Sequence, residues 1–218
     1  MQTEFILTED GSHTLYLAEI DECYHSSHGA IQESNHIFIE AGLKQCAKTE
    51  ITILEVGFGT GLNALLASIW AKKTETKINY ITLEKFPLPS DKALSLNFAK
   101  VLGENPENFE AIHKASWNNW NRIHPNFELM KIEVDFCNYQ HKTNYDIIFF
   151  DAFSPDKQPE MWTDIQFEKI YNHCNQEAIL TTYCAKGIVR RTMQNVGFVV
   201  ERLAGPPGKR EILRATKK

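Results

Sequence analysis

The chain has 218 residues, of which 43% are hydrophobic, and its formal net charge is −5. This length is sufficient for one large domain, and the apolar content is ordinary for a soluble globular protein. No apolar run approaches the ~18–20 residues that span a bilayer, and the acidic, polar N-terminus is unlike a secretory signal. We therefore expect a cytoplasmic protein with no membrane partner.

The charge is unevenly distributed along the chain. Residues 185–218 contain nine Lys or Arg and two Glu, whereas the remaining residues are acidic overall. A basic C-terminal end on an acidic body can attract phosphate groups locally, although a solvated tail would have the same composition. The net negative charge argues only weakly against a nucleic-acid partner.

The cysteines are odd in number, widely spaced and without a C-x-x-C pair, which predicts free thiols in a reducing compartment. Cys23, His25 and His28 lie close enough in sequence to suggest a metal site. No second group of ligands matches them elsewhere in the chain, and a structural zinc site needs four ligands. We predict no metal.

The alternation of apolar runs and amphipathic stretches predicts an α/β fold in two parts. Residues 1–45 are expected to form a small cap packed on the core, with strands at 4–7 and 14–18 and a helix at 29–44. Residues 46–218 are expected to form one domain with a seven-stranded, doubly wound and mostly parallel sheet. Its expected strands are residues 51–56, 80–83, 129–134, 145–150, 178–183, 198–203 and 211–215, the last two antiparallel, and its expected helices are residues 60–71, 90–102, 106–122, 160–173 and 185–196.

A glycine-rich loop follows the first strand of this domain, with Glu55, Gly57, Gly59 and Gly61 in the pattern E-x-G-x-G-x-G. Glycines permit a sharp turn and the close approach of a ligand, and the following helix N-terminus adds N–H donors. Leu62 stands where the dinucleotide fingerprint requires its third glycine, and no P-loop motif occurs, so both of these nucleotide classes are excluded. The loop instead resembles motif I of class I (Rossmann-like) methyltransferases, which implies S-adenosylmethionine as the cofactor.

Acidic residues also follow the next two expected strands. Glu84 ends the second strand, where it can reach ribose hydroxyls, and Asp135 ends the third, near an adenine. Ligands of open α/β sheets bind beyond the carboxyl ends of the strands. Each acid taken alone could be an exposed strand-end carboxylate, but acids at successive strand ends favour a cofactor site.

The fourth strand is followed by Asp151-Ala152-Phe153-Ser154-Pro155, which resembles the D-P-P-Y type motif of amino-methylating enzymes. Methyl transfer requires a neutral amine whose lone pair is aimed at the methyl carbon, and a carboxylate can orient or deprotonate such an amine. An aromatic ring can stack on a base or lie against a sulfonium. We predict Asp151 and Phe153 as catalytic residues; the alternative is a capping aspartate and a core phenylalanine.

Five blocks in order make the resemblance specific. They resemble the methyltransferase family of tRNA 5-methylaminomethyl-2-thiouridine biosynthesis, which forms the N-terminal half of bifunctional MnmC and occurs alone as MnmD. The resemblance runs from Tyr24 to Arg214, although Ala152 stands where the family often has glycine. The blocks are Gly57-Phe58-Gly59-Thr60-Gly61-Leu62-Asn63, Glu84-Lys85-Phe86-Pro87-Leu88, Asp151-Ala152-Phe153-Ser154-Pro155, Pro159-Glu160-Met161-Trp162-Thr163 and Gly208-Lys209-Arg210-Glu211.

The resemblance implies methylation of 5-aminomethyl-(2-thio)uridine at the wobble position of tRNA, giving 5-methylaminomethyl-(2-thio)uridine. The chain ends near residue 218, which leaves no room for the flavin half of the bifunctional relatives, so we expect no FAD. The partner would be a tRNA anticodon stem-loop with its wobble base splayed out. A monomer is compatible with the sequence, which leaves the oligomeric state open.

The same resemblance, with the position of basic residues near the crevice, gives a set of site residues. The resemblance supports a cofactor role for Glu55 less strongly than for Gly57, Glu84 or Asp151, because the motif I acid is not universal in the family. Phosphate contacts by basic side chains would set the salt dependence of binding. The expected cofactor residues are Glu55, Gly57, Gly59, Gly61, Asn63, Glu84, Lys85, Asp135 and Asp151, and the expected substrate residues are Tyr24, His25, Ser26, Pro155, Lys186, Arg190, Arg191, Lys209 and Arg210.

Two other functions stay open at this point. A small-molecule amine N-methyltransferase could use the same fold, and the basic C-terminal segment favours RNA over it. A non-catalytic tRNA- or partner-binding domain could retain a degenerate cofactor pocket, and the intact glycine loop and Asp151 argue against it.

Overall fold

The computed structural model describes residues 3–218, which contain one eight-stranded sheet and a smaller three-stranded sheet. All seven strands expected in the domain are present, and the eighth was missed. The strands of the large sheet are β4 (Glu50–Val56), β5 (Lys77–Glu84), β6 (Trp120–His124), β7 (Phe127–Glu133), β8 (Tyr145–Phe150), β9 (Cys174–Thr182), β10 (Val199–Ala204) and β11 (Glu211–Thr216).

The order of strands in the large sheet is β10-β11-β9-β8-β4-β5-β7-β6. Neighbouring strands from β9 to β7 are parallel, whereas β6 pairs antiparallel with β7, and β11 pairs antiparallel with both β9 and β10. The chain order reverses between β4 and β8, so the loops that follow these two strands diverge. A crevice for ligands is expected at this switch point, beyond the carboxyl ends of the strands.

The missed strand β6 lies in a segment for which we predicted a helix over 106–122. The helix α5 (Pro106–Lys114) ends early, and Asn118 adopts a left-handed backbone conformation with φ of 61° that interrupts a helix. The Asn121 side chain accepts a hydrogen bond from Ser116 N, which fixes the bend. β6 then pairs with β7 through a two-residue turn at Pro125 and Asn126, so strand pairing overrides the local helical pattern.

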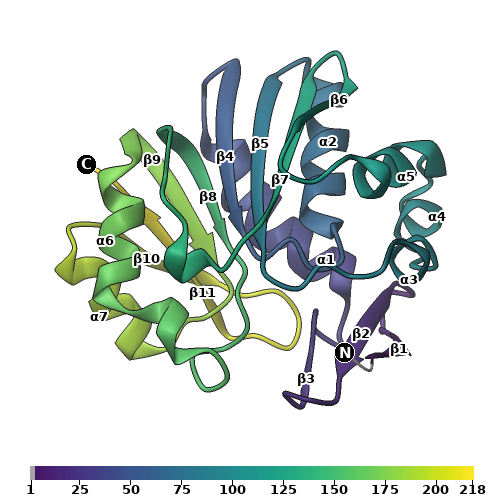
Figure 1. Cartoon of the computed structure of the whole chain (residues 1–218). Helices are drawn as coiled ribbons and strands as arrows, with labels where there is room; N and C mark the ends of the chain where they lie inside the picture. Colours follow the sequence, from purple (N-terminus) through teal and green to yellow (C-terminus); the bar gives the residue numbers. More distant parts are fainter. Residues whose placement is uncertain (1–2) are drawn as a thin grey trace.

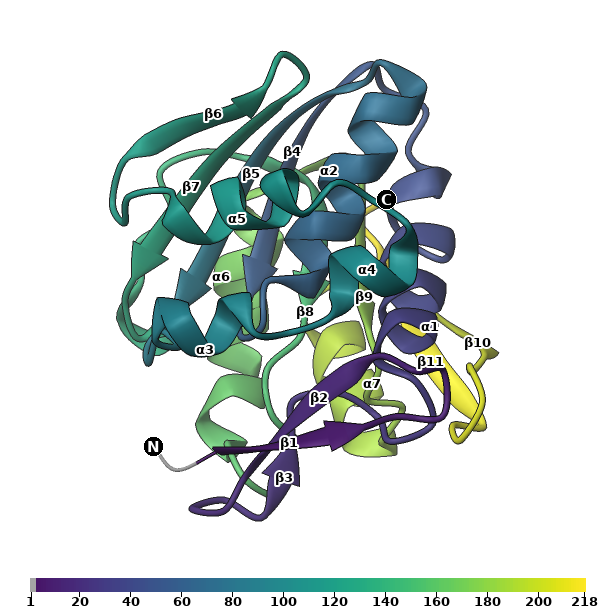
Figure 2. The same ribbon diagram turned by 90° about the vertical axis from the view of Figure 1, so that its right-hand side faces the viewer.

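The small sheet forms the cap. Its strands β1 (Thr3–Leu7), β2 (His13–Leu17) and β3 (Glu22–Cys23) pair antiparallel in chain order, and the first two confirm the expected strands. Figures 1 and 2 show this sheet beyond the carboxyl ends of the parallel strands. The cap therefore lies over the crevice side of the large sheet.

The helix expected over 29–44 is divided into α1 (Ala30–Ser34), a π-helical turn η1 (Asn35–Glu40) and a 3-10 turn η2 (Leu43–Gln45). Phe38 in η1 packs against Phe149 of β8, with ring centroids 5.1 Å apart. This segment therefore contributes directly to the main core.

Helices cover both faces of the large sheet (Figure 1). α1, α2 (Leu62–Thr74) and α5 pack on one face, and α6 (Asp164–Asn172) and α7 (Gly187–Asn195) pack on the other. All six residues of β8 are buried, as expected for a central parallel strand covered on both sides. The helix expected at 90–102 is broken into α3 (Ser90–Leu94) and α4 (Phe98–Leu102), and none of the helices in residues 3–218 is long and apolar enough to cross a membrane.

Candidate active site

A cavity of about 670 Å³ lies between the cap and the carboxyl ends of β4, β5, β7 and β8. Its size is within the range of small-molecule sites, and its walls come from the glycine loop, the strand ends, the cap and the loop after β8. Of the predicted site residues, it is lined by Tyr24, His25, Ser26, Gly57, Gly59, Asn63, Glu84, Lys85, Asp135, Asp151, Phe153 and Lys209.

The glycine loop has a geometry that only glycine adopts easily. Gly57 has a φ of 94°, and an added Cβ would lie 2.7 Å from the carbonyl oxygen of Asp151. The Gly57 and Phe58 N–H groups donate to the Leu83 carbonyl at 3.0 and 3.2 Å, which ties the loop to the end of β5. Gly61 is not in the cavity lining, because it faces His113 and Phe58 instead.

The wall formed by β5 and β7 carries three of the predicted polar residues. Glu84 accepts hydrogen bonds from Gly59 N at 3.0 Å and from Phe86 N at 2.8 Å. Lys85 forms an ion pair of 2.8 Å with Asp135, and the hydrogen bond from Lys85 holds the pKa of Asp135 below its usual value. Asp135 is therefore a charged group at neutral pH.

Asp151 lies at the end of β8 and faces the cavity. Its Oδ2 atom accepts a hydrogen bond of 2.8 Å from the Asn63 side-chain amide. Burial raises the pKa of Asp151 to about 7, with a smaller contribution from the charge of Glu33, while the Asn63 hydrogen bond and the charge of Lys209 lower it. A carboxyl group with this pKa exchanges a proton near neutral pH, as a general base must.

The loop after Asp151 is held in place on both sides. The backbone oxygen of Phe153 accepts a hydrogen bond of 2.9 Å from the Trp162 indole. The backbone N–H of Phe153 donates to the Gln158 side-chain oxygen at 3.1 Å. The Phe153 ring meets the Tyr24 ring edge to face, with centroids 5.3 Å apart. Two aromatic rings, one from the cap and one from this loop, thus lie together at the cavity.

The cap contributes His25 and Ser26. The His25 Nε2 atom is 2.6 Å from the Thr60 hydroxyl, and burial lowers the pKa of His25 to about 4, so the ring is neutral at pH 7. Ser26 N donates to Glu33 at 3.1 Å. The metal ligation considered for His25 and His28 receives no support, since no group of three His, Cys, Asp or Glu in residues 3–218 is placed to hold an ion.

Lys209, predicted as a substrate residue, lies in the cavity lining. Its Nζ atom is 3.2 Å from a Glu33 oxygen and 4.9 Å from the centroid of the Tyr183 ring. The ammonium group therefore faces the cavity and is already paired. Lys186 likewise pairs with Asp156, outside the cavity lining.

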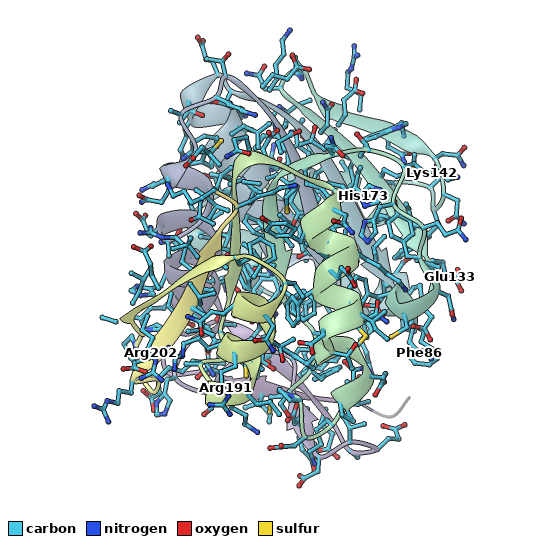
Figure 3. The ribbon with its side chains drawn as sticks, turned by 90° about the vertical axis from the view of Figure 1, so that its left-hand side faces the viewer. Phe86, Glu133, Lys142, His173, Arg191 and Arg202 are labelled. Atoms are coloured by element: carbon cyan, nitrogen blue, oxygen red, sulfur yellow. The ribbon has the colours of Figure 1, made fainter. Side chains whose placement is uncertain are left out.

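The remaining basic candidates lie outside the cavity. Arg191 and Arg210 are exposed, whereas Arg190 and Pro155 are only partly so, and none of the four is in the lining. Figure 3 shows Arg191 and Arg202 at the same end of the molecule as Phe86, which does line the cavity, and Lys142 and His173 toward the opposite end.

Glu55 is the other predicted cofactor residue that does not reach the cavity. Its side chain is 0% exposed and is absent from the lining. Strand alternation places it on the same face of β4 as Ile51 and Ile53, which pack in the core cluster that includes residues of α2. Burial raises the pKa of Glu55 to about 8.

The polar cavity residues outside the predicted set include Glu22, Glu33 and Tyr183. Glu22 of β3 accepts a hydrogen bond from the Ser154 hydroxyl, and Glu33 of α1 pairs with Lys209. The Tyr183 hydroxyl donates to the Ala152 carbonyl at 3.0 Å. Tyr183 directly follows β9, so its position at a strand end was an available signal, whereas Glu22 and Glu33 reach the site only through the placement of the cap.

The family model for S-adenosyl-L-methionine-dependent methyltransferases matches residues 102–218. The chain belongs to this methyltransferase family. Both the predicted fold class and the predicted enzyme class are thereby confirmed, with one strand more in the sheet than expected.

The methyltransferase is similar to curated proteins named tRNA 5-methylaminomethyl-2-thiouridine biosynthesis bifunctional protein MnmC. It is 32% identical to the protein of Ectopseudomonas mendocina, over 88% of this chain and 32% of that protein. It is 29% identical to the protein of a Marinomonas species, over 89% of this chain and 31% of that protein. The chain thus spans about a third of the length of these relatives.

Solved structures show the same likeness. The methyltransferase matches the crystal structure of MNMC2 from Aquifex aeolicus with a TM-score of 0.78 and 26% identity, over 100% of this chain and 70% of that chain. Spermidine synthase from Thermotoga maritima shares the fold at 11% identity, with a TM-score of 0.60 over 100% of this chain and 72% of that chain. The predicted family resemblance is therefore confirmed.

The residues of the cavity fit the cofactor that the family uses. The glycine loop presents its backbone to the cavity, and Glu84 and Asp135 place carboxylates along one wall. Phe136 and Met161 supply apolar surface on the same side. A volume of about 670 Å³ accommodates an adenosyl group, an amino-acid chain and part of a second ligand.

Proposed function

We propose that this methyltransferase transfers a methyl group to the aminomethyl nitrogen of 5-aminomethyl-(2-thio)uridine at the wobble position of tRNA. One observation carries the proposal: Asp151, held by Asn63, faces the cavity that the glycine loop also lines. A carboxylate beside the cofactor cavity suits an amine acceptor. The likeness to MnmC proteins, whose name specifies this tRNA modification, supports the substrate.

In this proposal, the wall of β5 and β7 binds the nucleoside part of the cofactor. Glu84 would accept hydrogen bonds from the ribose hydroxyls, and Asp135, Phe136 and Met161 would hold the adenine. Gly57 and Gly59 allow the methionine part to approach the backbone. S-adenosylmethionine supplies an electrophilic methyl group on a sulfonium, which is already a good leaving group.

Asp151 prepares the amine. Asn63 binds one carboxylate oxygen, and the other accepts no hydrogen bond from residues 3–218, so it is available to the amine N–H. With a pKa of about 7, Asp151 can take a proton from the aminomethyl group or orient its lone pair. Placement of the two reacting groups then supplies most of the rate enhancement.

The rings of Tyr24 and Phe153 provide a place for the wobble uridine. Single-stranded bases are commonly bound by stacking on aromatic rings. Outside the cavity, Lys186, Arg191 and Arg210 would meet phosphates of the anticodon stem-loop, which makes binding sensitive to salt. Cytoplasmic location and a monomeric enzyme remain predictions.

The test is methyl transfer to tRNA purified from a strain that lacks this modification, followed by nucleoside analysis. The expected product is 5-methylaminomethyl-(2-thio)uridine. Charge reversal in R191E on α7 should raise KM for tRNA and reduce its salt dependence. K72E, in the last turn of α2 and outside the cavity lining, should leave KM unchanged. Binding of S-adenosylmethionine without any methylated uridine, or equal methylation of small amines, would reject the tRNA assignment.

A further inference from the structure

A group of buried polar side chains lies directly under Asp151. It consists of Glu55 from β4, Tyr80 and Thr82 from β5, and Asn63 from α2. The Glu55 and Thr82 side chains and the Tyr80 hydroxyl are inaccessible to solvent, and Asn63 is 3% exposed. Asn63 connects this group to the cavity through its hydrogen bond to Asp151.

The atoms of this group lack regular hydrogen-bond partners within residues 3–218. In this group, the buried atoms without a hydrogen-bond partner are both carboxyl oxygens of Glu55, the Oδ1 atom of Asn63, and the hydroxyl oxygens of Tyr80 and Thr82. Tyr80, Thr82 and Asn63 are nevertheless the groups beside the Glu55 carboxyl, just outside regular geometry. Small side-chain adjustments would complete the contacts, because unsatisfied buried polar atoms are costly.

The donors and acceptors around Glu55 are compatible with a protonated carboxyl. The Asn63 amide already gives an N–H to Asp151, so its Oδ1 atom still needs a donor. An ionised carboxylate only accepts hydrogen bonds, so it could accept from the second Asn63 N–H but could not supply the donor that Asn63 Oδ1 lacks. A protonated carboxyl instead provides an O–H for Asn63 Oδ1 and accepts from Tyr80 and Thr82 with its remaining lone pairs.

The surrounding charges favour the same state. The charged group facing Glu55 is Asp151, a negative one, and the titratable neighbour is the Tyr80 phenol. No Lys or Arg is among the groups that act on Glu55 in the described part of the chain. Burial, with a smaller contribution from the charge of Asp151, raises the pKa of Glu55 to about 8 although hydrogen bonds from Thr82, Asn63 and Tyr80 lower it, so the carboxyl is mostly neutral at pH 7.

We propose that Glu55 is a positioning residue that works as a neutral acid: its O–H binds Asn63 Oδ1 and turns the amide so that Nδ2 holds Asp151 toward the amine. The motif I acid in this chain then acts on the methyl acceptor, through Asn63, and not on the cofactor. The kinetic part of the test rests on the function proposed above, but the protonation state of Glu55 does not.

The kinetic test compares E55Q with E55A over a range of pH. Gln keeps a donor, so E55Q should retain kcat within about threefold at pH 7, less than the loss of one hydrogen bond. E55A loses the donor, and kcat should fall by about tenfold or more while KM for the cofactor changes little. Wild-type kcat should decline above pH 8 as Glu55 ionises, and E55Q should not show this decline.

T181V is the matched control. Thr181 on β9 is also fully buried with an unpartnered hydroxyl, and it does not belong to the group around Glu55. It should keep the wild-type kcat and pH profile. An alkaline decline that persists in E55Q, or E55Q as inactive as E55A when both are folded, would overturn the proposal.

Infrared spectroscopy gives a readout that needs no substrate. At pH 7 the wild type and D151N should both show the C=O band of a buried protonated carboxyl, and E55Q should lack the part that titrates near pH 8. Absence of this band from D151N would overturn the neutral-acid role. If the band of a protonated Glu55 is present but tRNA is not methylated, the neutral-acid role of Glu55 stands and only the proposed substrate is rejected.

Discussion

Replacing Asp151 by asparagine removes the carboxylate from the cavity and preserves the shape of the side chain. In D151N the new amide oxygen can still accept the 2.8 Å hydrogen bond from Asn63, so the loop after β8 should keep its position. What disappears is the group that accepts a proton from the amine. The substitution therefore tests chemistry with little change in structure.

The size of the effect follows from the role of a general base, which contributes about 10²–10⁴-fold to a rate. We expect kcat of D151N to fall by that factor, equivalent to about 3–5 kcal/mol of activation free energy. Since the pKa of Asp151 is about 7, kcat/KM of the wild type should rise as pH increases to about 7, before the separate decline expected above pH 8 from Glu55. D151N should lack this rise.

D151N should lower the rate of methyl transfer but raise the stability of the folded protein at alkaline pH. The folded state of the wild type holds a proton on Asp151 up to about pH 7, whereas the unfolded state has released it near its ordinary pKa of 3.8. Stability is therefore lost as pH rises from about 4 to 7. D151N has no such loss and should be more stable than the wild type at pH 8.

The assay is single-turnover methyl transfer to aminomethyl-uridine tRNA, with cofactor affinity measured separately by calorimetry. The matched control is D156N, because Asp156 lies in the same loop outside the cavity lining and pairs with Lys186. A kcat of D151N within about tenfold of the wild type, at full cofactor occupancy, would refute a base at this position.

Three further substitutions test the loop, the β5 wall and the support beneath them. G57A should weaken cofactor binding at least tenfold and lower Tm, because its Cβ would lie 2.7 Å from the Asp151 carbonyl oxygen. The control is G103A, since Gly103 also has a positive φ but has open space where a Cβ would lie, so its substitution reports the backbone strain alone. Equal effects of the two substitutions in calorimetry would contradict the proposed steric contact. E84Q should raise the cofactor Kd about tenfold, near 1.4 kcal/mol, with little change in Tm, and an unchanged Kd would argue against ribose binding by Glu84. In K131M the ammonium that donates to the His113 carbonyl at 2.8 Å is lost. Burial lowers the pKa of Lys131 to about 8, so between pH 8 and its ordinary value of 10.5 the folded state has released a proton that the unfolded state keeps. Wild-type stability to urea should rise over that window relative to K131M, and parallel curves would count against this shift.

The sequence was sufficient to locate most of the site, because its residues follow strand ends. Asp151 and Glu84 were placed in the cavity by one rule: parallel strands next to each other end at the same edge of a sheet. The glycine pattern was equally readable, since a positive φ at Gly57 and its contact with the Asp151 backbone require glycine in any such loop. These are local features, and local features can be read from a single chain.

The direction of a side chain was not readable in the same way. Glu55 precedes the glycine loop and was predicted to bind the cofactor, but it is fully buried and outside the cavity lining. Only the packing of α2 over β4 places its carboxyl under Asn63 and out of reach of a ligand. Lys209 is a similar case, because Glu33 and Tyr183, from distant parts of the chain, turn its charge inward.

The sequence by itself thus determined the class of fold and brought the glycine loop and Asp151 to the cavity, since periodicity and strand-end position depend on neighbouring residues. Tertiary structure alone decided that β6 is a strand, because its pairing partner β7 outweighs a weak helical pattern. It also decided which charged groups meet solvent, the cavity or each other. Those outcomes depend on contacts between segments far apart in the chain, which no local pattern encodes.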